Sequence, residues 1–593
     1  MRLHMKKIRP LAAVAVGLVA TSGLAACGGG DSGGGTKGAG YNAAVDKVIN
    51  ASDTKGGELR LAISDDFDSP DPGNTYYAWS QNFVRLYGRG LLTFKPSAGP
   101  DSNQVIPDLA EGPGQTPDNG KTWTYKLRSG VKYDDGTPVT SKDVKYAVER
   151  SNFSDELQLG PKYFKAYLQD NSTPYKGPYK DKSPEGLKSI ETPDDNTITF
   201  KLAKPFAEFD YLVAMAQSIP VPQARDTGLK YEQKMASSGP YKVDSYERGK
   251  SMILSRNPNW DKSTDPIRKA LPDKITLQLK QSGDDIDNRL LAGSLDVDAA
   301  GVGVQAGTQG KLLTDQTKKA NTDNPLQGYL RFASLNLHVK PLDNVHCRRA
   351  VQYATDKVAM QSAYGGPLAG GDVATTILPP GIVGYQKFDK YPQTYKQGGG
   401  LDDKTLQAAK SELQQCGQPN GFKTKIAGRS DRPKEIAMAQ AMQQGLKQVG
   451  IQTDIVQYPA GDYFNKYVGA PEFVHKNGVG IMLMAWSADW PTGYGFLSQI
   501  LDGRAIKPSG GNNLPEEDNP AINKAFDDAI GNTDKDARAK IYGQIDQMAM
   551  DDAVDIPIIY AKALLYRPSN LANVGISQGY GGMYDYLNLG VKK

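Results

Sequence analysis

The segment Lys121–Arg150, KTWTYKLRSGVKYDDGTPVTSKDVKYAVER, combines the patterns of a strand, a turn and a helix. Apolar and polar residues alternate from Trp123 to Leu127, which predicts a half-buried strand. Residues 134–136 (DDG) predict a turn. Thr140 or Ser141 predicts the N-cap of the helix that follows. A strand joined to a helix by a short turn is the unit from which α/β proteins are built.

Elements of the same two kinds continue on both sides of this segment. Before residue 325 we expect strands at 58–63, 198–202 and 275–279, a hairpin at 241–254, helices at 80–92 and 286–291, and surface loops over 150–190. After residue 325 we expect strands at 329–337, 451–456, 479–486 and 554–560, with helices at 345–364, 405–416, 434–449, 520–530 and 535–551. The alternation after residue 325 predicts an α/β fold with a helix-covered sheet.

The N-terminus has the pattern of an export signal. A basic head precedes an uncharged apolar run over 11–20, and Leu24–Cys27 (LAAC) matches a bacterial lipobox, which predicts cleavage before Cys27 and acylation of that residue. The alternative is a transmembrane anchor, but the apolar run is shorter than the ~20 residues a spanning helix needs. The glycine-rich tract 28–40 predicts a flexible tether.

Charge and cysteine content limit the possible partners and compartment. The formal charge of +4 arises from four basic residues in the signal peptide, so the remaining chain is neutral and offers no basis for a nucleic-acid partner. Cys347 and Cys416 remain after Cys27 is assigned to the lipid. Because disulfides persist in exported proteins, we expect these two to pair; two separate buried thiols are the alternative.

Motifs for catalysis are incomplete. Residues 249–251 (GKS) end like a phosphate loop, but the glycine required five positions earlier is Asp244. The GISQG sequence at 575–579 has no histidine after it, since the last one is His475. We therefore expect no enzyme, no cofactor and no metal site, while a hydrolase with paired carboxylates stays open.

Four stretches together resemble the family-5 extracellular solute-binding proteins of ABC importers, the group with oligopeptide-, dipeptide- and nickel-binding members. They are 121–150, 238–260 (SGPYKVDSYERGKSMILSRNPNW), 335–357 (LNLHVKPLDNVHCRRAVQYATDK) and 484–497 (MAWSADWPTGYGFL). The resemblance implies a two-lobed periplasmic-binding-protein-like clamshell, monomeric and anchored by lipid at the outer face of the cytoplasmic membrane. It would bind a small molecule, foremost a peptide, and dock on a permease.

The resemblance also implies a division of the chain. The expected parts are a signal peptide (1–26), a tether (27–56), lobe I (57–90, 232–320 and 556–593), a subdomain inserted in lobe I (91–231) and lobe II (321–555). Chain crossings near 321–330 and 552–560 would form the hinge, and ligand binding would close the lobes.

The stretch Trp486–Asp489 (WSAD) matches the pattern in which peptide-binding relatives hold the α-amino group with an acidic residue. The resemblance implies this role for Asp489, with Trp486, Ser487 and Trp490 around it. Tyr76, in the loop over 67–77, is a second candidate for the cleft lining. The alternative for Asp489 is to cap the turn that follows it. Alternative functions are binding of an oligosaccharide or a metal chelate, hydrolysis, and surface adhesion.

Overall fold

The computed structural model describes residues 39–181 and 185–592. The predicted signal peptide, the predicted lipidation site at Cys27 and the first part of the predicted tether lie outside the described residues. Within the described part of the chain, none of the helices has the length and apolar character needed to cross a membrane.

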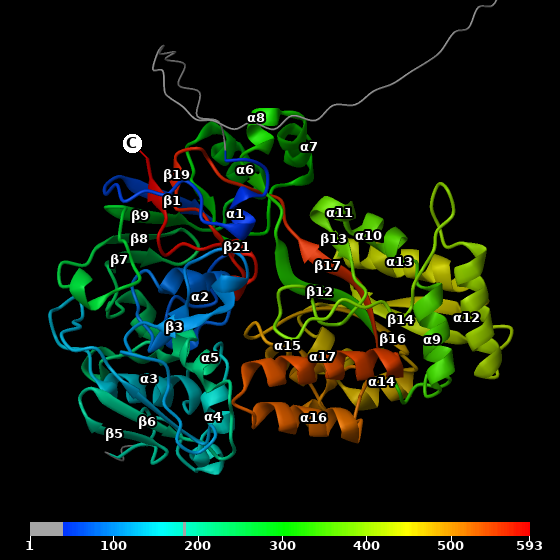
Figure 1. Cartoon of the computed structure of the whole chain (residues 1–593), viewed down its shortest axis with the longest axis horizontal. Helices are drawn as coiled ribbons and strands as arrows, with labels where there is room; N and C mark the ends of the chain where they lie inside the picture. Colours follow the sequence, from blue (N-terminus) through cyan, green and yellow to red (C-terminus); the bar gives the residue numbers. More distant parts are fainter. Residues whose placement is uncertain (1–38, 182–184, 593) are drawn as a thin grey trace, which may run out of the picture. The chain divides into compact units, whose positions relative to one another are not determined.

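Lobe I is built on a five-stranded sheet (Figure 1). The sheet contains β1 (Glu58–Ala62), β7 (Tyr241–Glu247), β8 (Ser251–Arg256), β9 (Lys274–Gln278) and β10 (Val297–Asp298) in the order β10-β1-β9-β8-β7. β1 runs parallel to both neighbours, whereas β7, β8 and β9 are antiparallel. The strands predicted at 58–63 and 275–279 and the hairpin at 241–254 are confirmed, as is the helix at 286–291 within α6 (Gly283–Ala292).

The segment predicted as the inserted subdomain has its own sheet, and its apolar core also includes Trp490 of lobe II. It contains β4 (Thr122–Lys126), β5 (Ile190–Asp194), β6 (Thr197–Lys201), α3 (Ser141–Asn152), α4 (Tyr163–Tyr167) and α5 (Phe209–Val213), with strand order β4-β6-β5. The strands at 123–127 and 198–202 are confirmed. Thr140 is the N-cap of α3, and its backbone N–H donates to Asp143 at 2.8 Å. The segment 150–190 differs from the loops expected, because α4 forms there and Phe164, Tyr175 and Leu187 are buried.

The helix expected over 80–92 is shorter in the structure. α2 spans Ala78–Val84, and β2 (Leu92–Phe94) begins where the helix was expected to end. A Cβ atom on Gly88 would lie 2.8 Å from the Ile219 side chain, and one on Gly90 would lie 3.1 Å from Ser218 Oγ. The two glycines therefore allow the turn after α2 to approach the segment 216–219 closely.

Lobe II is built on a six-stranded mixed sheet. Its strands are β12 (Leu326–Leu335), β13 (Gly371–Val373), β14 (Lys423–Arg429), β15 (Gln452–Tyr458), β16 (Ile481–Ser487) and β17 (Asp555–Lys562), in the order β13-β17-β12-β16-β14-β15. Residues 481–484 of β16 are all buried, as expected for a strand with both faces covered.

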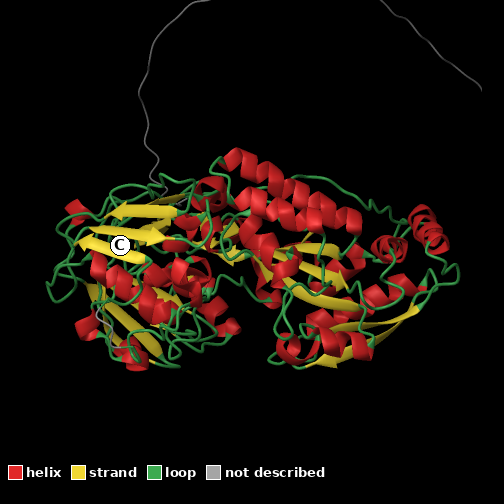
Figure 2. Ribbon diagram, turned by 90° about the horizontal axis from the view of Figure 1, so that it is seen from below, coloured by secondary structure: helices red, strands yellow, loops and turns green. Residues whose placement is uncertain are grey.

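Helices cover both faces of this sheet (Figures 1 and 2). One face packs on α9 (Val345–Ala354), α10 (Lys357–Tyr364), α12 (Asp403–Gln415) and α13 (Pro433–Lys447), and the other on α15 (Gly493–Leu501), α16 (Pro520–Ile530) and α17 (Lys535–Asp552). The single helix expected over 345–364 is two helices, because Thr355 is extended and Asp356 caps α10 through the N–H of Ala359 at 2.8 Å. Cys347 in α9 and Cys416 after α12 form the predicted disulfide.

Shorter elements connect these layers. They are α1 (Ala43–Asp46), α7 (Ala306–Thr314), α8 (Gln316–Lys319), α11 (Gly366–Ala369), α14 (Pro471–Asn477), β3 (Val105–Pro107), β11 (Thr322–Asp323), β18 (Leu565–Tyr566), β19 (Leu571–Ala572), β20 (Ile576–Ser577), β21 (Met583–Tyr584) and β22 (Gly590–Val591). The α/β class and the two lobes are as expected.

Two expected boundaries differ from the structure. Part of the segment assigned to the tether is packed, since Ala44 and Ile49 are buried in the lobe I core and Ile49 pairs with Val574. Burial of these apolar side chains holds the segment against the C-terminal part of the chain. β17 continues to Lys562 in the lobe II sheet, so the chain leaves lobe II after residue 562 rather than at 555.

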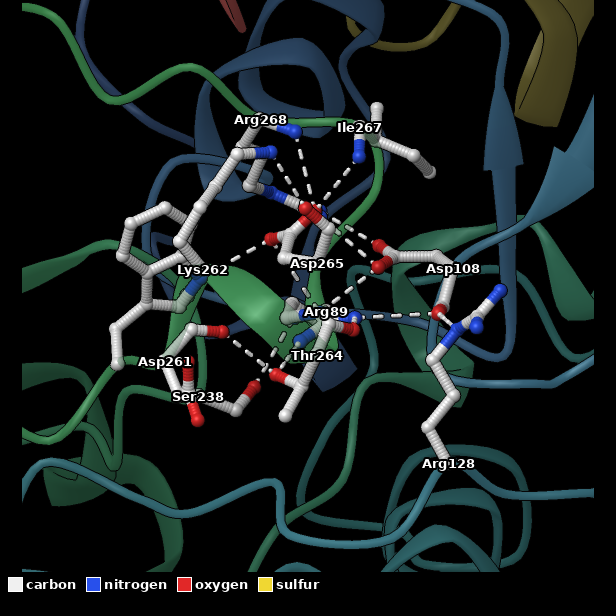
Figure 3. Close-up of polar contacts among 12 residues, drawn as sticks. Arg89, Asp108, Arg128, Ser238, Asp261, Lys262, Thr264, Asp265, Ile267 and Arg268 are labelled. Atoms are coloured by element: carbon white, nitrogen blue, oxygen red, sulfur yellow. Dashed lines mark hydrogen bonds and ion pairs between the residues drawn. The ribbon is translucent and has the colours of Figure 1, made fainter.

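A buried network of charges joins the inserted subdomain to lobe I (Figure 3). The Asp108 carboxylate accepts hydrogen bonds from Arg89 Nε at 2.8 Å and from Arg268 Nη2 at 2.6 Å. Arg268 Nη1 donates to Asp265 Oδ2 at 3.2 Å. All four side chains are fully buried. Because each charge has an opposite partner and hydrogen bonds, burial of the four groups is tolerated.

Candidate ligand-binding site

Asp489 lies in the short connection between β16 and α15. Its backbone N–H donates to the carbonyl of Gly495 at 3.1 Å, and Thr492 caps α15 through the N–H of Gly495 at 3.1 Å. The strand, the cap and this backbone bond fix the position of the Asp489 carboxylate at the end of the sheet.

The Asp489 carboxylate accepts hydrogen bonds from the hydroxyls of Tyr76 and Tyr163. Tyr76 belongs to lobe I and Tyr163 to α4 of the inserted subdomain, so three distant segments of the chain meet at this carboxylate. The turn that follows uses the backbone rather than the Asp489 side chain, since the carboxylate bonds go to the two tyrosines.

The electrostatic environment of Asp489 is unusual for a carboxylate. Burial raises the pKa of Asp489, and the hydrogen bonds from Tyr163 and Tyr76 act in the opposite direction. Burial and the negative charge of Asp489 together raise the pKa of Tyr163 well above its ordinary value. Among the described residues no lysine, arginine or histidine forms an ion pair with Asp489. Within residues 39–181 and 185–592, the carboxylate thus has two hydrogen-bond donors and no ion-pair partner.

Tyr76 is held by the loop that precedes α2. The Asp68 carboxylate accepts hydrogen bonds from the backbone N–H groups of Tyr76 and Tyr77 and, at 2.6 Å, from the Thr75 hydroxyl. Gln81 Nε2 donates to the Tyr76 carbonyl at 3.1 Å. These bonds position the phenol toward lobe II, so the structure brings Tyr76 of the predicted loop to Asp489.

Trp490 connects lobe II to the inserted subdomain. Its side chain is buried, with its ring edge-to-face to Tyr163 at a centroid distance of 5.4 Å, and its indole N–H donates to Glu208 Oε2 at 2.6 Å. Glu208 also accepts hydrogen bonds from Thr492 and Tyr542, both at 2.7 Å. The lobes are therefore in contact through a buried carboxylate that lies next to the candidate site.

The other two residues of the predicted set lie on opposite faces of β16. Trp486 packs against the lobe II core, and its indole N–H donates to the Phe496 carbonyl at 2.8 Å. Ser487 pairs with Tyr329 of β12. The structure thus brings together Asp489, Tyr76 and Trp490. Trp486 packs in the lobe II core and is bonded to α15, the helix that follows the Asp489 segment.

Sequence reasoning did not identify Tyr163 and Glu208 as site residues. The only signal was the abundance of tyrosine in the segment 150–190, which does not indicate which phenol reaches Asp489. In the described ranges, no group of three or more histidine, cysteine, aspartate or glutamate residues is arranged to hold a metal ion.

Comparisons with known proteins show the family of the chain. Residues 104–508 match the family described as bacterial extracellular solute-binding proteins, family 5. The chain is 28% identical to heme-binding protein A of Haemophilus influenzae over 82% of this chain and 83% of that protein, and 24% identical to the oligopeptide-binding protein OppA of Bacillus subtilis over 89% and 91%.

A solved structure is closer in sequence. The clavulanic acid biosynthesis oligopeptide binding protein 2 is 41% identical, with a TM-score of 0.89 over 94% of this chain and 99% of that one. The family match covers residues 104–231 of the predicted inserted subdomain and the segment that carries Asp489. The chain is therefore a member of the bacterial extracellular solute-binding proteins of family 5.

Proposed function

We propose that this protein is a lipid-anchored receptor that captures peptides between its lobes and delivers them to an ABC permease. The names of two relatives, an oligopeptide-binding protein of Bacillus subtilis and the solved oligopeptide binding protein, support a peptide as ligand. The lipobox at Leu24–Cys27 supports the anchor, which would take more than one acyl chain to be stable.

The observation that carries this proposal is the Asp489 carboxylate. It lies where both lobes and the inserted subdomain meet, it has two neutral hydroxyl donors and it has no cationic partner among the described residues. A partly buried carboxylate without a counter-charge favours a ligand that brings one, and the α-ammonium of a peptide supplies both the charge and three N–H donors.

Delivery to a permease follows from lobe closure. In this proposal the contacts of Glu208 and Tyr76 across the lobes are those of the closed arrangement, toward which ligand binding would shift an open ensemble. The permease would then distinguish the closed, loaded receptor from the open one.

The test is isothermal titration of the full chain with a degenerate tetrapeptide library, after native mass spectrometry of the purified protein to identify what it already carries. In the variant Asp489→Asn we expect the free energy of peptide binding to become less favourable by about 3 kcal/mol or more, as when one partner of a buried ion pair is removed. Asp454→Asn removes an exposed carboxylate of β15 in the same lobe and is the matched control.

N-acetylated peptides should bind wild-type protein as weakly as free peptides bind Asp489→Asn. Equal affinity of Asp489→Asn and wild type would refute the assigned role of Asp489. If a sugar or a metal chelate co-purifies and no peptide binds, the ligand of this protein belongs to that class and is not a peptide.

A further inference from the structure

The chain passes between the lobes twice, and the two passages are paired with each other. β11 leads into β12 of lobe II, and β17 leads out of lobe II into β18. β11 and β18 form an antiparallel pair through residues 322–323 and 565–566. β12 and β17 continue side by side into lobe II (Figure 1). A rotation of one lobe against the other must be absorbed by the backbone of these two passages.

Residues 40–44, here called the N-terminal strap, lie along the first passage. The backbone N–H of Gly40 donates to the carbonyl of Ala320 at 3.2 Å, and the N–H of Asn42 donates to the carbonyl of Thr322 at 2.9 Å. Equal steps of two residues in the same direction are the pattern of a strand that runs parallel to its neighbour. The strap is therefore bonded to the chain around β11 as an added strand would be.

Side chains hold the strap in this position. Asn42 Oδ1 accepts a hydrogen bond from the N–H of Asn324 at 2.6 Å, and Asp323 Oδ1 accepts one from the N–H of Ala44 at 3.0 Å. Ala44 and Asp323 are fully buried. Asn42 has a φ of 60°, a left-handed conformation that asparagine tolerates better than most residues. In this conformation both its N–H and its side-chain oxygen bond to the first passage.

Arg567 bonds the strap to the second passage. It follows β18 directly, and its Nη2 donates to the carbonyls of Gly40 at 2.5 Å and Ala320 at 2.7 Å. Its Nη1 is paired with Asp323, and the arginine side chain is only 1% exposed. Such charge-assisted hydrogen bonds are stronger than neutral ones. One buried guanidinium thus joins the strap, the first passage and the second passage.

The strap is fixed to lobe I at one end and is connected to lobe II at the other. Ala44 and Ile49 pack in the lobe I core. Asn324, whose N–H is held by Asn42, donates through Nδ2 to the carbonyl of Leu368 in α11 at 3.0 Å. α11 leads into β13 of the lobe II sheet. The strap therefore connects the core of one lobe with a helix of the other across the first passage.

We infer that the N-terminal strap restrains the hinge, favouring the present arrangement of the lobes and resisting their opening. This inference rests on the lobe closure of the proposed function and adds to it a segment that sets how readily the lobes open. Such a shift changes the apparent affinity of any ligand that binds between the lobes, whatever its class. Because the predicted tether precedes the strap in the sequence, an anchored protein would be held at its hinge.

The experiment is hydrogen–deuterium exchange of the full chain with the substitution Asn42→Gly. Glycine adopts the same positive φ without strain, so the variant loses only the side-chain acceptor of the Asn324 N–H. We expect exchange to become roughly fivefold faster at Ala207 and at 489–493, as for an opening equilibrium that loses one hydrogen bond. Ala207 donates to Ile530 of lobe II and has no part in the strap, so a local effect would not reach it.

Asn50→Gly is the matched control. Asn50 also has a positive φ, of 54°, but its side chain donates to the carbonyl of Leu571 at 3.0 Å, within lobe I. Exchange at Ala207 and at 489–493 should stay as in wild-type protein. Arg567→Lys, which keeps the charge but not the two-pronged geometry, should act in the same direction as Asn42→Gly and gives a second test of the strap.

The other outcomes overturn the inference in distinguishable ways. Faster exchange confined to 40–46 and 320–324 would show a packed terminus that does not influence the hinge. Equal acceleration at Ala207 in Asn42→Gly and Asn50→Gly would remove any specific role of the strap. In wild-type protein, protection at Ala207 as strong as in the buried strand β16 would mean that the lobes separate only on unfolding. That result would overturn the lobe closure of the proposed function together with this inference.

Discussion

The indole N–H of Trp490 donates to Oε2 of Glu208 at 2.6 Å. Trp490 belongs to lobe II, and Glu208 belongs to the subdomain inserted in lobe I. Tyr542 and Thr492 donate to the same carboxylate, which is only 1% exposed. Glu208 therefore accepts hydrogen bonds from three residues of lobe II, and it also lies 3.6 Å from Nε of Arg538. Hydrogen bonds to a buried charged group stabilise more than neutral ones.

Replacing Glu208 with glutamine should favour opening of the lobes. The amide N–H groups would face the donors of lobe II, and buried Arg538, 3.6 Å from Glu208, would lose its counter-charge. We expect the contact between the lobes to weaken by about 2 kcal/mol or more, which corresponds to at least roughly thirtyfold more opening. Hydrogen–deuterium exchange should become faster at Ala207, whose N–H donates to Ile530 in lobe II at 2.8 Å, and at 489–493.

Asp210→Asn is the matched control for this substitution. Asp210 is on α5, close to Glu208, but accepts from Tyr125 at 2.8 Å within the inserted subdomain. In this variant hydrogen–deuterium exchange should become faster near Gly114, whose backbone N–H donates to Asp210, and exchange at 489–493 should stay as in wild-type protein. Equal acceleration of 489–493 in both variants would contradict a specific role for Glu208.

The disulfide should stabilise lobe II substantially. Cys347 and Cys416 are separated by 69 residues, and closing a loop of this size restricts the unfolded chain by about 4 kcal/mol. We expect Cys347→Ser with Cys416→Ser to lower the free energy of unfolding by an amount of this order in urea titrations, and reductant to have no effect on that variant.

Peptide mapping provides an independent check of the pairing. Without reduction, the peptides that contain Cys347 and Cys416 should be found linked and should not react with an alkylating agent. Alkylation of both thiols before reduction would show that they are not paired in the purified protein.

The buried network around Asp265 should make the protein sensitive to acid. Burial by itself would raise the pKa of Asp265, but the charges of Arg268 and Arg89 and backbone N–H donors hold it well below the ordinary range. Because the pKa is lower in the folded state, the stabilisation is complete above the unfolded-state pKa of about 3.9 and is lost as the pH falls below it.

Asp265→Asn should lower the free energy of unfolding by about 3–5 kcal/mol at pH 7, because two buried arginines lose a counter-charge. The variant should also show a weaker decline between pH 5 and 3 in denaturant titrations. Asp273→Asn removes an exposed partner of Arg256 and should change stability by less than about 1 kcal/mol. A similar loss of unfolding free energy in both variants would contradict the stabilising role of the buried network.

Asp555 should have the opposite pH dependence. It is fully buried at the start of β17, accepts from Ser334 at 2.6 Å, and has no partner for its second oxygen. Burial raises the pKa of Asp555 to about 7. The unfolded chain releases this proton near pH 3.9, so the contribution of Asp555 to stability decreases as the pH rises from about 4 to 7.

Asp555→Asn should remove this slope, because an amide does not titrate and its oxygen still accepts from Ser334. Free energies of unfolding at pH 4, 5.5 and 7 should therefore vary less in the variant than in wild-type protein. An unchanged slope in the variant would assign the pH dependence to other groups.

Local patterns predicted much of the secondary structure. The strand–turn–helix pattern at 121–150 appears as β4 and α3, and the apolar run at 479–486 as the buried strand β16. Errors occurred where a tertiary contact competes with the local pattern. The helix expected over 80–92 stops at Val84 because the following turn packs against residues near Ile219, and the long helix expected over 345–364 divides where Asp356 caps a second helix.

By itself, the sequence predicted the α/β class and the pairing of the two cysteines, both of which the structure confirms, because periodicity and residue type are local properties. Asp489 was a candidate through the resemblance to a family. The tertiary structure decided that Tyr76 and Tyr163 meet at Asp489 and that Glu208 accepts a hydrogen bond from Trp490. Tyr163 and Asp489 are 326 residues apart. Contacts at such separations depend on how two lobes and an inserted subdomain pack, and no local pattern of the sequence specifies which side chains that packing brings together.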